Sequence, residues 1–145
     1  MRYLIILLLF PMYCNAQYPI YTEFNGGVGI TYERDALPTI ALVAGKMFPM
    51  GDYSFVDLQA GLAYESIFTG KVGVGSWFGD NEAFSIQGGI RLYPVALYLN
   101  AMIGEPNRMQ MLLSAEMGGA TKWATNFIGM FNMGIRIPFN CKKNG

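Results

Sequence analysis

The sequence predicts an all-β fold: an eight-stranded, antiparallel, up-and-down transmembrane β-barrel that follows a cleaved signal peptide. Polar and apolar residues alternate along eight segments, which places successive side chains on opposite faces of a strand. Only 14% of the residues are charged and 52% are hydrophobic, against roughly 25% charged in an ordinary soluble domain. After the first residues, no apolar run approaches helix-spanning length. Such a composition without long apolar runs is typical of strands that cross a membrane.

The first residues have the features of a secretory signal peptide. Arg2 precedes an apolar run over residues 4–10, and the Cys-Asn-Ala segment at 14–16 resembles a small-residue cleavage site. A single spanning helix is the weaker alternative, because it needs roughly 20 apolar residues. The predicted division is a signal peptide at residues 1–16, a β-barrel domain at residues 17–140 and a short C-terminal tail at residues 141–145.

The first four predicted strands cover residues 21–33, 39–48, 53–65 and 71–78. In the first strand, Phe24 lies on the apolar face and Glu23 on the polar one; in the third, Leu58 and Asp57 are divided in the same way. The second is apolar on both faces apart from its first residue and Lys46, so its orientation stays open. Segments rich in glycine, proline and aspartate separate several of these strands and predict turns.

The last four predicted strands cover residues 83–93, 95–104, 109–120 and 126–138. The fifth alternates most regularly, with Ile90 on the apolar face and Arg91 on the polar one, and Pro94 ends it because proline cannot donate to a central ladder. In the eighth, the alternation places Phe127 on the apolar face and Arg136 on the polar one. Aromatic residues such as Phe127, near the ends of apolar faces, indicate interfacial girdles.

Charged side chains on the polar faces are predicted to meet inside the barrel. Eight strands enclose an interior just wide enough for side chains to fill, and unpaired charges would be costly there. We therefore expect a plugged interior in which carboxylates hold Arg91 and Arg136. The predicted lumen charge network comprises Glu23, Glu33, Asp57, Glu65, Lys71, Arg91, Glu116 and Arg136.

The same alternation would suit a secreted soluble β-sandwich or a lipocalin-like binding protein. Two features favour the membrane barrel over this alternative. The predicted strands approach the roughly 9 to 11 residues that cross a bilayer at a tilt, whereas soluble strands cluster near 5 or 6. The polar faces are rich in glycine, serine, asparagine, glutamine and paired charges but hold few lysines.

The last strand reads Gly-Ile-Arg-Ile-Pro-Phe over residues 134–139, and residues 89–93 read Gly-Ile-Arg-Leu-Tyr. Together with the signal peptide and eight amphipathic strands with short connections, this pattern resembles the small eight-stranded outer-membrane β-barrel proteins of Gram-negative bacteria. The resemblance spans nearly the whole mature chain, although the tail after Phe139 departs from members that end on the terminal aromatic. It implies a location in the bacterial outer membrane, with outer-membrane lipid around the barrel.

The sequence offers little for catalysis. It has no histidine, the usual general base of barrel enzymes that cleave acyl chains, phospholipids or peptides, and we expect no cofactor. With 10 basic and 10 acidic residues, the chain has no net charge that would attract nucleic acid. We expect a non-enzymatic barrel with a structural or envelope-interaction role and an envelope protein as a further partner. The alternative within the barrel class is a narrow pore for small solutes.

Overall fold

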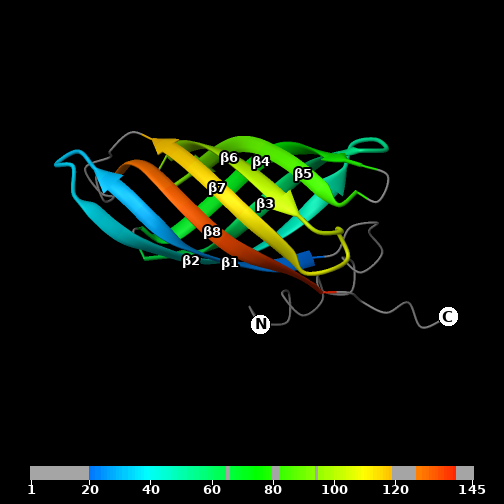
Figure 1. Ribbon diagram of the computed structural model, residues 1–145, viewed down its shortest axis with the longest axis horizontal. Coiled ribbons are helices and arrows are strands. Elements are labelled where there is room, and N and C mark those ends of the chain that lie inside the picture. Colours follow the sequence, from blue (N-terminus) through cyan, green and yellow to red (C-terminus); the bar gives the residue numbers. More distant parts are fainter. Residues whose placement is uncertain (1–19, 65, 80–81, 94, 119–126, 140–145) are drawn as a thin grey trace, which may run out of the picture.

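Eight antiparallel strands close into a barrel in chain order, and β1 pairs with β8 to complete it (Figure 1). This is a computed structural model that describes residues 20–64, 66–79, 82–93, 95–118 and 127–139; the predicted signal peptide and the C-terminal tail lie outside these residues. The predicted barrel is therefore confirmed, and its closure contradicts the β-sandwich alternative. The strands are β1 (Ile20–Thr31), β2 (Ala36–Pro49), β3 (Ser54–Ala63), β4 (Ile67–Phe78), β5 (Phe84–Leu92), β6 (Val95–Ile103), β7 (Gln110–Gly118) and β8 (Phe127–Phe139).

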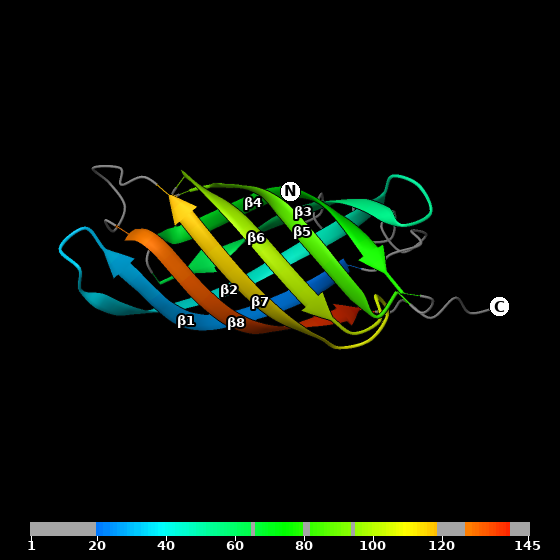
Figure 2. The same ribbon diagram turned by 45° about the horizontal axis from the view of Figure 1, so that its top comes forward.

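Within the part of the chain that is described, no helix has the length and apolar character to cross a membrane. The barrel has two ends that differ in their connections. We call the end where β1 begins the N-terminal end; it carries the β2–β3, β4–β5 and β6–β7 connections. The opposite end carries the remaining connections, including the β1–β2 hairpin that projects in Figures 1 and 2.

Strand β2 is longer than predicted and its orientation is now defined. It begins at Ala36, three residues early, because residues 36–40 continue the ladder with β1, whereas the ladder with β3 begins at Ala41. Pro38 lies in this segment, so its missing N–H interrupts no ladder with β3. Val43 and Met47 are buried inside the barrel, whereas Lys46 points outward.

Strand β4 also begins earlier than predicted, at Ile67 rather than at Lys71. The chain reverses within a tight turn after Ala63, where the Ser66 N–H donates to the Ala63 carbonyl at 3.2 Å. Ile67 adopts a left-handed φ of 64° at this turn. The residues up to Gly70 therefore pair with β3 instead of forming a loop.

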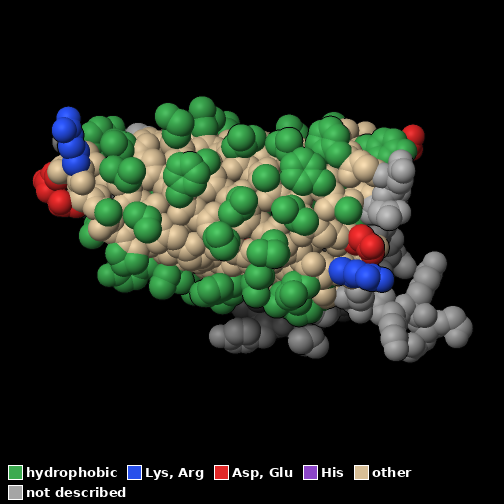
Figure 3. Space-filling view, viewed as in Figure 1, with side chains coloured by type: hydrophobic (Ala, Val, Ile, Leu, Met, Phe, Trp, Pro, Cys, Tyr) green, Lys and Arg blue, Asp and Glu red, His purple; other side chains and the backbone are tan. Residues whose placement is uncertain are grey.

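Burial alternates along the strands, with polar side chains inside and apolar side chains outside. Figure 3 shows hydrophobic side chains along the length of the barrel and charged side chains gathered at its two ends. Leu62, Leu97 and Phe131 are 55%, 66% and 75% exposed. A soluble lipocalin-like barrel requires the reverse, a polar exterior and an apolar interior, so the arrangement of side chains disfavours that alternative.

The interior is layered along the barrel. At the N-terminal end a cluster of large apolar side chains fills it, and the rings of Phe55 and Trp77 pack there at a tilt of 38°, with centroids 5.5 Å apart. The buried charged side chains lie beyond this layer, toward the opposite end, whereas the buried amide of Gln110 lies at the N-terminal end, where it donates to the Gly104 carbonyl. The apolar cluster comprises Tyr21, Met47, Phe55, Trp77, Met102 and Leu112.

The predicted outward position of Phe127 is wrong. The β1–β8 register shifts at the opposite end, so that Ile30 pairs with Gly129 and Thr31 pairs with Phe127. This irregularity inserts one residue into β8 and turns Phe127 into the interior, where it is 6% exposed. The ring covers Gly29 so closely that a Cβ there would overlap Phe127 Cε1.

Candidate functional site in the barrel interior

Six of the predicted network residues are buried inside the barrel, on six different strands. Each is at most 4% exposed, and together they are three carboxylates and three cations, so their formal charges cancel. No other charged side chain is buried among the described residues. The six, which we call the interior ion network, are Glu23, Asp57, Lys71, Arg91, Glu116 and Arg136.

One half of the network surrounds Arg136. Its Nε and Nη2 donate to Glu23 Oε2 at 2.9 and 2.6 Å, and Nη2 also donates to Asp57 Oδ2 at 3.2 Å. The guanidinium carbon lies 3.8 Å from the centroid of the Tyr21 ring, and the Tyr21 hydroxyl donates to Asp57 Oδ1. Arg136 is thereby held by two carboxylates and one aromatic face. Because Glu23 and Arg136 are register partners on β1 and β8, this contact spans the closing seam.

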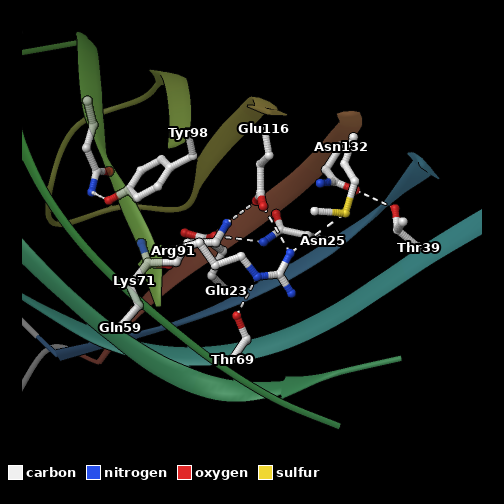
Figure 4. Close-up of polar contacts among 12 residues, drawn as sticks. Glu23, Asn25, Thr39, Gln59, Thr69, Lys71, Arg91, Tyr98, Glu116 and Asn132 are labelled. Carbon is white, nitrogen blue, oxygen red and sulfur yellow. Dashed lines mark hydrogen bonds and ion pairs between the residues drawn. The ribbon is translucent and has the colours of Figure 1, made fainter. Parts of the chain in front are cut away.

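The other half is centred on Glu116, and Figure 4 shows its contacts. Lys71 Nζ donates to Glu116 Oε1 at 2.6 Å, and Arg91 Nη1 donates to Glu116 Oε2 at 2.9 Å. Arg91 Nε also donates to Thr69 Oγ1 at 2.8 Å. Lys71 and Arg91 are register partners on β4 and β5, so two like charges face one another. Such a pair is destabilising by itself, and the carboxylate on β7 compensates both cations.

Amide side chains extend the network between its charged members. Gln87 Nε2 donates to Asp57 Oδ2 and to the Tyr98 hydroxyl, each at 2.9 Å. Gln59 Nε2 donates to the same Asp57 oxygen at 2.9 Å, and Asn25 Nδ2 donates to Glu23 Oε1 at 2.7 Å. The carboxylates are therefore satisfied by several strands at once, which fixes the relative positions of those strands.

The two remaining predicted members do not belong to this network. Glu33 is exposed in the β1–β2 turn, so the prediction that it lies inside is wrong. The physical reason is that β1 ends at Thr31, whose carbonyl accepts from the Arg34 N–H at 2.9 Å while Arg34 adopts a left-handed φ of 67°. The chain has thus begun to reverse before the next inward position. Glu65 lies outside the described residues.

The sequence-based network omitted residues that contact its members. Tyr21, Thr69 and Tyr98 all bond to charged or amide groups inside the barrel. Their spacing in the sequence could have identified two of them: Tyr21 precedes Glu23 by two residues, and Thr69 precedes Lys71 by two. Side chains two residues apart in a strand share a face. Tyrosine near a strand end also fits an interfacial anchor, so composition alone does not distinguish the two positions.

A small cavity lies beside the Glu116 half of the network. A cavity of about 10 Å³ is lined by Asn25, Thr39, Lys71, Arg91 and Glu116 among others, which is about the room that one water requires. On the β5–β7 wall, however, some buried polar groups have no hydrogen-bond partner within the described part of the chain, among them both amide atoms of Asn100 and the Ser114 hydroxyl. Asn100 and Ser114 are neighbours in the β6–β7 register.

The chemistry available to the interior is ion pairing and hydrogen bonding. Among the described residues, no group of three or more histidine, cysteine, aspartate or glutamate side chains could hold a metal ion. The carboxylates contact cations and amides instead of one another. This arrangement joins strands that are distant in sequence, from β1 to β8 and from β4 to β7.

Comparison with known proteins supports the fold. No protein-family model matches the sequence, and no curated protein matches it. A solved structure described as "De novo design of transmembrane beta-barrels" is similar to this chain, with a TM-score of 0.50 and 14% sequence identity. The likeness covers 86% of this chain and 99% of the other. At this identity it shows a shared fold: the architecture is that of a transmembrane β-barrel.

Proposed function

We propose that this protein is a non-enzymatic barrel of a bacterial outer membrane, with a plugged polar interior and a structural or envelope-interaction role. The observation that carries the proposal is the inversion of polarity, with an apolar exterior around a charge-balanced interior ion network. This combination suits a barrel whose wall separates the surrounding lipid from a sealed interior.

The exterior argues for lipid as the surrounding medium. Soluble monomers rarely expose contiguous apolar patches larger than a few hundred Å², whereas apolar side chains extend here along the barrel (Figure 3). The strands contain 9 to 14 residues, enough for the roughly 9 to 11 that a tilted crossing needs. The signal-peptide features of residues 1–16 and the resemblance to small Gram-negative barrels support export to the outer membrane.

The interior argues for a plug. The balanced charges are paired in direct contacts of 2.6 to 3.2 Å, and the apolar cluster fills the N-terminal end. An ion that entered would have to replace these contacts in a narrow, weakly solvated space. The described connections are also short, since residues 32–35 alone separate β1 from β2. They leave little loop surface for recognition, so contacts with an envelope protein would use the barrel wall or its rims.

A narrow pore is the second candidate. The amide of Asn100 and the hydroxyl of Ser114 favour it: neither has a partner among the residues that the structure describes, and water along this wall would supply one. The two candidates predict different conductance. A plug held by the interior ion network passes no stable ionic current, whereas a pore along Asn100 and Ser114 gives a current that responds to changes in these residues.

Two measurements test the proposal. Cell fractionation followed by electrophoresis of heated and unheated detergent extracts should place the protein in the outer-membrane fraction and show a heat-dependent shift in migration. A protein that is soluble without detergent would contradict the membrane location. Planar-bilayer recordings of the refolded protein should show no stable conductance in ordinary salts; a steady conductance that Asn100→Val or Ser114→Val abolishes would establish the pore instead.

A further inference from the structure

A shallow groove crosses the outer surface of β1 to β4. Strand register places four small outward residues in one row, and rows of larger side chains flank it on both sides. The row consists of Thr22, Ala44, Ala60 and Gly70. The flanking row nearer the N-terminal end consists of Ile20, Lys46, Leu58 and Val72, and the one farther from it consists of Phe24, Leu42, Leu62 and Phe68.

An open surface hollow borders the middle of this row. A hollow of about 320 Å³ is lined there by Ile20, Ala44, Lys46, Leu58 and Ala60, together with strand residues beneath them. Because strands tilt in a barrel, the row runs obliquely: it lies near the start of β1 at one side and near the start of β4, at the opposite end of the barrel, at the other. An extended chain following it would pass from the N-terminal end at β1 toward the opposite end at β4.

Lys46 gives the groove its chemical character. It is the one charged side chain that points outward from the described strand residues. It lies three residues before the end of β2, and its Nζ is 5.2 Å from the centroid of the Phe48 ring. A lysine near the edge of the apolar band extends its amine toward the headgroup region. A cation at the mouth of an apolar groove matches a ligand with one anionic end and a long apolar end.

We propose that this groove binds one acyl chain of an anionic phospholipid, with the headgroup phosphate on Lys46; the inference rests on the proposed membrane location. An anionic headgroup fits better than a zwitterionic one, because no carboxylate points outward from the described strand residues to receive an ammonium. A second copy of this chain fits less well. A two-fold dimer packed through the groove would bring two Lys46 side chains of like charge into one interface.

The experiment uses the full chain, refolded into vesicles of equal parts phosphatidylglycerol and phosphatidylethanolamine, then extracted gently and examined by native mass spectrometry. We expect the wild-type barrel to retain phosphatidylglycerol preferentially. Ala60→Phe fills the groove and should remove the retained lipid. Lys46→Gln should keep an acyl chain in place but reduce the preference for phosphatidylglycerol about fivefold, because one lysine near a membrane surface contributes about 1 kcal/mol.

Ala101→Phe and Arg108→Gln are the matched controls. Ala101 is a small outward residue on β6, across the barrel from the groove, and Arg108 is an exposed cation in the β6–β7 connection; neither change should alter lipid retention. Heat-modifiability of every variant in the same vesicles reports folding separately. A wild-type protein that shows no heat shift and no insertion would overturn the membrane location itself. Inserted Ala60→Phe with unchanged lipid, or a dimer that this change dissociates, would overturn the lipid site alone.

Discussion

Glu23 and Arg136 face each other across the β1–β8 seam, joined by hydrogen bonds of 2.9 and 2.6 Å that are wholly shielded from solvent. The first and last strands are thus connected by a buried ion pair as well as by their backbone ladder. Breaking one partner of such a pair leaves an uncompensated buried charge, which costs far more than removing an exposed pair.

We therefore expect Glu23→Gln to lower the free energy of unfolding by about 3 to 5 kcal/mol, measured by urea titration of the protein in detergent micelles. Glu105→Gln is the control, because the Glu105–Arg108 pair is 3.2 Å apart but largely exposed. Its effect should be small. Adding Arg136→Met to Glu23→Gln leaves Asp57 without its cation, so it should not restore full stability. Equal effects of the two glutamate changes would contradict the structural role of the seam pair.

Loss of the Glu116 carboxylate should destabilise the barrel, and a second substitution should partly restore its stability. Glu116→Gln leaves Lys71 and Arg91 as facing buried cations, and we expect a loss of about 3 to 5 kcal/mol in unfolding free energy. Lys71→Met in the same chain should recover part of this loss, because it removes one of the two like charges. A double-mutant cycle measures the coupling between the positions. Additive effects of the two substitutions would show that Glu116 does not compensate Lys71.

Replacing Asn100 should not lower the free energy of unfolding, in contrast to the changes at Glu23 and Glu116. Its side chain is fully buried and neither amide atom has a hydrogen-bond partner among the described residues. Asn100→Val should therefore leave the unfolding free energy unchanged or raise it by about 1 kcal/mol, because it removes an unsatisfied polar group. Gln87→Val is the matched control on the neighbouring strand, since Gln87 donates to Asp57 and Tyr98 and its loss should destabilise. A strong loss at Asn100 would indicate hydrogen bonds to internal water.

A larger residue at Gly29 should destabilise the barrel by a steric clash that a smaller residue at Phe127 relieves. Gly29→Ala places a methyl group against the Phe127 ring, and overpacking of this kind costs about 1 to 3 kcal/mol. Phe127→Leu in the same chain should reduce that cost. Gly26→Ala is the control, because a Cβ there would meet only the Thr39 carbonyl, at 4.0 Å, and would point outward. Thermal unfolding followed by circular dichroism in micelles distinguishes these cases, and equal losses at the two glycines would refute the contact.

The strand number and the inward face of most strands could be predicted because a period of two is a local property of the sequence. The inward positions of Asp57 and Arg91 could be predicted from this alternation alone. The orientation of β2 could not be predicted in this way, because Val43 and Met47 are apolar and yet lie inside. Their place is set by the pairing of β2 with β1 and β3, whose register places Val43 beside Glu23 and Met47 beside Asp57.

The failures at Glu33 and Phe127 have a common cause. Both lie near the end of a strand, where a turn or an added residue changes the phase of alternation. The tight reversal after Thr31 removes Glu33 from the inward series, and the β8 irregularity reverses the face of Phe127. Which carboxylate meets which cation was likewise beyond the sequence, because those contacts depend on the register of distant strands.

The distribution of the interior ion network along the chain has a consequence for assembly. Strands β1 to β7 contribute three carboxylates and two cations, a formal charge of −1, and β8 contributes the single cation that balances them. A sheet that lacks its last strand therefore keeps a net anionic interior and an exposed edge. Docking of β8 neutralises the interior and closes the backbone ladder in the same step. We therefore expect charge neutralisation, as well as backbone pairing, to favour the docking of the final strand.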